Sequence, residues 1–81
     1  MDGLTIAEEA LDLVSAGASL ADIDEMESAL ALCIGGMTFR NGYWEIVPAV
    51  RRVLGNTPPD QALPRFQRGV EVCKAARRLV A

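Results

Sequence analysis

The stretch Gly35–Leu54, GGMTFRNGYWEIVPAVRRVL, constrains the fold of this chain more than any other. Its Asn41-Gly42 pair is flanked by apolar and aromatic residues, and both residues tolerate the positive φ that a type I′ turn requires. We therefore expect an irregular or β-hairpin-like segment at residues 38–44. The stretch also holds three of the four aromatic residues of the chain, which are Phe39, Tyr43 and Trp44.

A second interpretation makes Asn41 a helix cap and residues 43–54 a helix. Pro48 argues against an early start of such a helix, because proline has no backbone N–H and fits only the first turn. We expect a short helix that starts at residues 45–48 and ends at Leu54, before Gly55-Asn56.

Helical patterns precede this stretch. Thr5 and Glu8 have the spacing of a capping box, and an apolar pattern with helical period follows to about residue 16. Ser19 and Asp22 repeat the box before a second pattern that ends at Gly35-Gly36. The two helices are joined by only two or three residues, which predicts an antiparallel or steeply crossed pair.

The last helix is expected to follow the turn at residues 57–60, to begin near residues 62–64 and to end at about Val80. Pro64 would then lie in its first turn. Gly69 inside this helix costs about 1 kcal/mol relative to alanine and predicts a close helix crossing. The fold class is therefore all-α: residues 1–81 form a single small helical domain, a compact bundle of three to four short helices.

The charge of the chain changes sign at Arg40. Eight acidic and no basic residues precede it, whereas eight basic and three acidic residues follow from Arg40 onward, so the two parts carry −8 and +5. Such asymmetry suits internal pairing of the two parts, head-to-tail association or a charged partner. The candidate acidic face on the first two helices consists of Glu8, Glu9, Asp12, Asp24, Glu25 and Glu27.

The sequence carries no enzyme signature. It has no histidine, so the most common general base and metal ligand are both missing. The acidic residues 22–27 lack the spacing of an EF-hand loop, and no glycine-rich phosphate-binding motif is present. We predict a protein that is not an enzyme and has no metal site and no cofactor.

Tryptophan, tyrosine and arginine dominate protein-binding hot spots, and the central stretch contains all three. We therefore hypothesise a small regulator, an inhibitor or adaptor, that acts through protein–protein contacts. In a competing interpretation Phe39 and Trp44 fill the core from a loop. A nucleic-acid-binding protein that uses the basic C-terminal half is the alternative function. The candidate partner-binding residues are Arg40, Tyr43, Trp44, Arg51 and Arg52.

The size of the chain favours a homodimer or higher oligomer. A domain this small buries only roughly 60% of the surface of its unfolded chain, yet 51% of its residues are apolar. Cys33 and Cys73 lie in apolar helical patterns, which indicates reduced thiols in a cytoplasmic protein. We expect no signal peptide and no membrane partner, because the longest uncharged run, Ser28–Phe39, has 12 residues where a span needs about 20.

Overall fold

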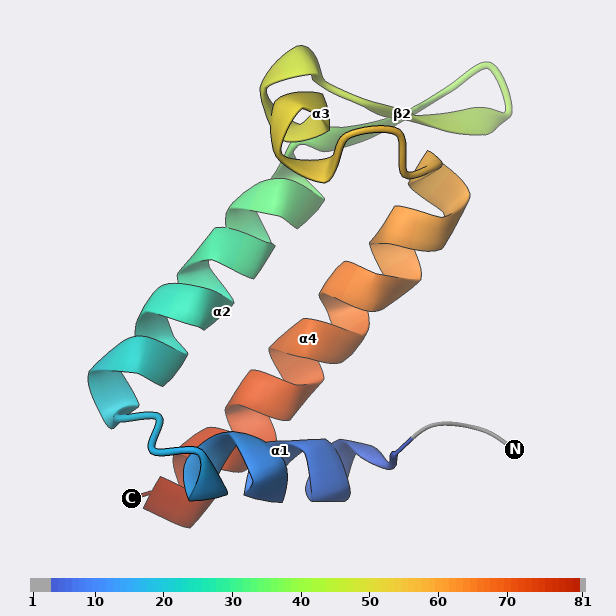
Figure 1. The fold of residues 1–81 in the computed structure, drawn as a ribbon. Coiled ribbons are helices and arrows are strands. Elements are labelled where there is room, and N and C mark those ends of the chain that lie inside the picture. The colour runs from blue at the N-terminus through green and yellow to red at the C-terminus, as the bar shows by residue number, and fades with distance from the viewer. Residues whose placement is uncertain (1–3, 81) are drawn as a thin grey trace.

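The computed structural model describes residues 4–80, which form four helices and one two-stranded antiparallel hairpin (Figure 1). The long helices α2 and α4 run side by side in opposite directions, α1 crosses one end of the pair, and the hairpin and α3 cover the other. The predicted helical fold with a hairpin segment is confirmed. The elements are α1 (Ile6–Ser15), α2 (Leu20–Gly35), β1 (Met37–Arg40), β2 (Tyr43–Ile46), α3 (Pro48–Leu54) and α4 (Pro59–Val80).

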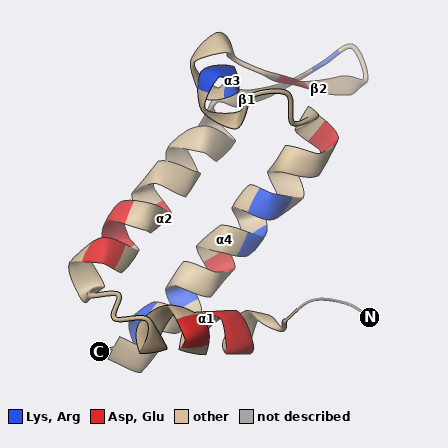
Figure 2. Cartoon of the chain, viewed as in Figure 1, with Lys and Arg blue, Asp and Glu red and all other residues tan. Residues whose placement is uncertain are grey.

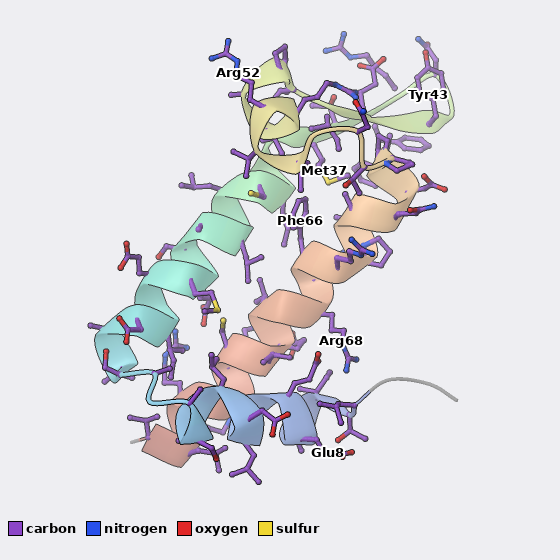
Figure 3. The ribbon with its side chains drawn as sticks, viewed as in Figure 1. Glu8, Met37, Tyr43, Arg52, Phe66 and Arg68 are labelled. Carbon is purple, nitrogen blue, oxygen red and sulfur yellow. The ribbon has the colours of Figure 1, made fainter. Side chains whose placement is uncertain are left out.

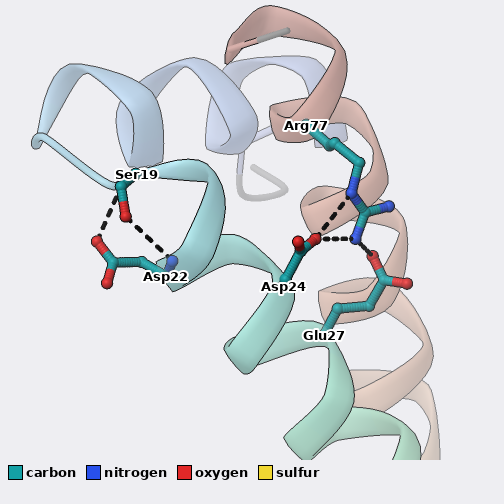
Figure 4. A network of polar contacts seen from close by, with 5 residues as sticks. All are labelled: Ser19, Asp22, Asp24, Glu27 and Arg77. Carbon is teal, nitrogen blue, oxygen red and sulfur yellow. Dashed lines mark hydrogen bonds and ion pairs between the residues drawn. The ribbon is translucent and has the colours of Figure 1, made fainter.

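Both predicted capping boxes start their helices. Thr5 Oγ1 accepts a hydrogen bond from the Glu8 N–H at 3.2 Å, and Glu8 Oε1 accepts one from the Thr5 N–H at 3.3 Å. Ser19 and Asp22 make the same reciprocal pair at 3.1 and 2.9 Å (Figure 4). These bonds satisfy N–H groups that a helix start otherwise leaves free.

The Ser19–Asp22 box predicts an acid-sensitive contribution to stability. Hydrogen bonds from the backbone N–H and then the side chain of Ser19 lower the pKa of Asp22 below its ordinary 3.8. Because the folded carboxyl holds its proton less tightly than the unfolded one, the contribution is present above this ordinary pKa and is lost as the pH falls through the folded pKa. We expect Asp22→Asn to lower the free energy of unfolding at pH 7.

This difference between the Asp22→Asn variant and the wild type should shrink as the pH falls below 3.8, the ordinary pKa of the carboxyl. Urea unfolding followed by circular dichroism at several pH values measures it. A difference that stays constant as the pH falls below 3.8 would show that the carboxylate of Asp22 does not contribute through its charge.

The hairpin forms as predicted and is longer than residues 38–44. β1 and β2 pair from Met37↔Ile46 to Arg40↔Tyr43. The turn residues Asn41 and Gly42 have φ of 52° and 87°, as a type I′ turn requires. Met37 and Ile46 are buried and anchor the hairpin on the helices.

The core consists of two clusters at opposite ends of the α2–α4 pair. The hairpin-end cluster contains Met37, Ile46, Val50, Ala62 and Phe66. The α1-end cluster contains Ala10, Ile23, Cys73 and Ala76. Leu30 packs against both clusters. A Cβ at Gly69 would lie 2.8 Å from Leu30 Cδ1, so Gly69 marks a close crossing, as predicted.

The start of the last helix differs from the prediction. α4 begins at Pro59 rather than at residues 62–64, and Pro64 lies inside it. Pro59 tolerates this position because the first residues of a helix need no N–H donor. The added turn buries Ala62 in the hairpin-end cluster, and the Ala62 N–H donates to the Pro58 carbonyl at 3.0 Å. Burial of this turn offsets the hydrogen bond that Pro64 cannot make.

Candidate functional site

The candidate site is the hairpin, which extends beyond the two long helices (Figure 1). Phe39 and Trp44 face each other across the strands. Their ring centroids lie 5.2 Å apart with an interplanar angle of 63°, an edge-to-face arrangement that aromatic pairs prefer. Phe39 is 59% exposed and Trp44 38%. The interpretation in which these two rings fill the core is therefore wrong.

The two faces of the hairpin carry different side chains, because successive residues of a strand point to opposite faces. Phe39 and Trp44 share the face of the buried pair Met37 and Ile46. This aromatic face thus continues the core outward into solvent. We call the exposed part of it, Phe39 and Trp44, the aromatic pair.

Arg40 and Tyr43 lie opposite each other on the other face. Figure 3 shows Tyr43 near the tip of the hairpin. Arg40 Nε is 3.9 Å from Glu45 Oε2, and both side chains are exposed enough for this contact to be weak. The predicted hot spot of Arg40, Tyr43 and Trp44 is therefore divided between two faces.

Arg51 and Arg52 lie in the last turn of α3, at the same end of the molecule as the hairpin. Positive charge is favourable at the carboxyl end of a helix. Both residues are exposed, neither makes an ion pair within the described chain, and Figure 3 shows Arg52 pointing away from the helices. They add positive charge to the end of the molecule that carries the hairpin.

The predicted acidic face is partly neutralised by α4. Arg77 Nη2 lies 2.8 Å from Asp24 Oδ1 and 2.6 Å from Glu27 Oε1 (Figure 4). Its hydrogen bonds to Asp24 and then Glu27 raise the pKa of Arg77. Arg68 Nη2 lies 2.7 Å from Glu9 Oε2 and also donates to the Leu4 carbonyl.

The six acidic candidates consequently do not form one free surface. Figure 2 shows acidic positions on α1 and on the first half of α2, and basic positions along α4. Glu8 is used by the first capping box. Asp12 and Glu25 are exposed and make no ion pair within the described residues. Internal pairing thus accounts for part of the charge asymmetry.

The cysteines lie in separate clusters and are unpaired. Cys73 is fully buried in the α1-end cluster, and burial raises the pKa of its thiol. Cys33 packs against the hairpin-end cluster. In the part of the chain that the structure describes, no three potential metal ligands of the types His, Cys, Asp and Glu gather at one place. No helix among these residues is long and apolar enough to cross a bilayer.

Sequence reasoning missed Phe39 as a site residue, although a signal was present. A two-residue turn at Asn41-Gly42 fixes the register of the strands. This register places Phe39 opposite Trp44 and Arg40 opposite Tyr43, as observed.

Comparison with known proteins gives no match to this chain among protein-family models, curated proteins or solved structures.

Proposed function

We propose that this chain is a non-enzymatic protein-binding module, a small regulator of the inhibitor or adaptor type, and that it binds its partner through the hairpin. The observation that carries this proposal is the aromatic pair, exposed on a face that continues the core. Burying apolar surface contributes about 25 cal/mol per Å², and aromatic side chains bring large areas with few rotatable bonds. Binding of the aromatic pair in an apolar pocket of a partner would bury this surface and so contribute free energy to the complex.

The arginines near the hairpin suggest the charge of the partner. Arg40 lies at the end of the hairpin, and Arg51 and Arg52 lie on the adjacent helix α3. Charges at the rim of an interface act mainly on association rate and specificity. The proposed partner surface is therefore an apolar pocket bordered by acidic groups.

Nucleic-acid binding by the basic half has less support. Arg68 and Arg77 are paired with carboxylates of α1 and α2. Contacts to phosphates would have to compete with these ion pairs, which weakens the electrostatic argument for this function. It stays a prediction, and the experiment on the hairpin also tests it.

The proposal includes a cytoplasmic location, supported by two free cysteines that belong to different clusters. Structural disulfides are typical of oxidising compartments, and these thiols are not arranged to form one within the chain. The homodimer expected from the thin core is not required for binding through the hairpin.

The test is affinity capture from a source lysate with tagged wild-type protein and the double variant Phe39→Ala/Trp44→Ala. Leu79→Ala is the control, because Leu79 is an exposed apolar side chain near the other end of α4. Removing two hot-spot residues costs at least about 2 kcal/mol, or roughly 30-fold in affinity. We expect one protein to be captured stoichiometrically by the wild type and the control and to be lost with the double variant.

Circular dichroism checks that the double variant keeps its helices, so that loss of capture reports on contact. Equal capture by all three proteins would contradict the proposal. Capture that disappears from every sample on nuclease treatment would favour the nucleic-acid alternative instead.

A further inference from the structure

A second surface lies away from the hairpin, toward the end of the helix pair that α1 crosses. A groove of about 620 Å³ opens between α1, α2 and α4, and we call it the α1 groove. Its apolar lining includes Leu4, Leu13, Met26 and Val72. Leu4 is 46% exposed and Met26 41%. These side chains expose apolar surface that nothing in the described chain covers.

The charged lining of the α1 groove is balanced in sign. α1 supplies Glu9 and Asp12, and α4 supplies Arg65 and Arg68. Glu9 and Arg68 pair within the chain at 2.7 Å, and Figure 3 shows Arg68 directed from α4 toward the start of α1. Asp12 and Arg65 are exposed and make no ion pair within residues 4–80. The groove therefore keeps one free charge of each sign, on two different helices.

The shape of the chain indicates that one broad face lacks a covering layer. Its Cα atoms span 41 × 31 × 18 Å with a radius of gyration of 13.9 Å, against about 12 Å for a compact domain of this length. The chain exposes 5574 Å², and a compact monomer of 8.7 kDa exposes about 4,700 Å². Stable folds pack at least two layers, and in this chain α1, the hairpin and α3 pack only at the two ends of the α2–α4 pair.

A second copy of the chain matches both free charges at once. A two-fold axis through the groove would place α1 of each copy near α4 of the other, because a two-fold interface brings the same patch of both copies together. Asp12 then faces Arg65 of the partner subunit, and the contact occurs twice. A partner with charge of a single sign would leave Asp12 or Arg65 unmatched.

We propose that the chain forms a two-fold homodimer through the α1 groove. The apolar lining of the groove and two symmetric ion pairs, each between Asp12 of one protomer and Arg65 of the other, would hold the dimer together. The chain exposes about 900 Å² more than a compact monomer of its mass, and a standard interface buries about 800 Å² of each partner. The inference does not depend on the hairpin, which stays free at the far end of each protomer.

The test uses charge reversal in full-length protein, with mass measured by sedimentation equilibrium at low salt. We expect the wild type to be a dimer and Asp12→Arg and Arg65→Asp each to weaken dimerisation at least tenfold, since each brings like charges together twice. An equimolar mixture of the two single variants should form a heterodimer, because every Arg then faces an Asp. The double variant Asp12→Arg/Arg65→Asp should dimerise again for the same reason.

Matched controls are Glu25→Arg and Arg78→Asp, which reverse exposed charges that do not line the α1 groove. Both should remain dimers, and circular dichroism verifies that all variants are folded. A monomeric wild type would overturn the proposal. Single variants that dimerise normally, or a mixture that fails to form the heterodimer, would show that Asp12 and Arg65 do not meet across the interface.

Discussion

Replacing Phe66 with alanine is expected to lower the free energy of unfolding by about 3–5 kcal/mol. Phe66 is the largest side chain of the hairpin-end cluster and is 7% exposed. A domain of this length has a total stability of about 4–12 kcal/mol, so much of the population should unfold or lie close to the transition. Urea unfolding followed by helical circular dichroism measures the loss.

Phe39→Ala is the matched control, because it removes the same ring from an exposed position. This change removes the edge-to-face contact with Trp44, which contributes about 0.5–1.5 kcal/mol. Equal losses at Phe39 and Phe66 would mean that the Phe39 ring is packed as part of the core, and the binding role of the aromatic pair would have to be given up.

Gly36→Ala is expected to cost about 1–3 kcal/mol through overpacking. Gly36 caps α2 with φ −82°, a conformation that any residue adopts, so the effect is purely steric. An added Cβ would lie 2.4 Å from Val50 Cγ2 and 3.2 Å from Val47 Cγ2. Val50 is short, stiff and buried, so the clash moves the backbone of α3 or the hairpin. Thermal unfolding gives the measurement.

Gly69→Ala provides the comparison, because its Cβ would also meet a side chain. The contact, Leu30 Cδ1 at 2.8 Å, is the end of a flexible side chain that can rotate. Alanine also gains about 1 kcal/mol of helix propensity over glycine. The two effects oppose each other, and we expect a net change below about 1 kcal/mol. A loss as large as that of Gly36→Ala would show that Leu30 cannot move, and that the α2–α4 crossing is rigid at this point.

Local signals predicted most of the fold. The two capping boxes located the starts of α1 and α2, and Asn41-Gly42 located the hairpin, because each depends on residues adjacent in sequence. The predicted start of α4 was wrong because Pro64 is a strong local signal for a helix start. The burial of Ala62 in the hairpin-end cluster is a tertiary contact, which the local sequence does not show. Leu32 shows the same limit. It belongs to the apolar pattern of α2, yet it is 76% exposed because no element of residues 4–80 covers it.

The candidate site was only partly predictable. Composition singled out Arg40, Tyr43 and Trp44, but strand alternation places Trp44 on the opposite face from the other two. The α1 groove was not predicted, because Asp12 and Arg65 come from helices that are distant in sequence.

The positions of the helices and of the turn follow from the sequence alone, since caps, turn residues and apolar period act over a few residues. Packing of these elements against one another determines which side chains remain in water. Packing of α4 against α2 pairs Arg77 with Asp24 and Glu27. The position of the hairpin leaves Phe39 and Trp44 exposed beyond the core. The physical reason is that burial and charge pairing depend on what lies opposite a side chain, and the periodicity of one segment does not contain this information.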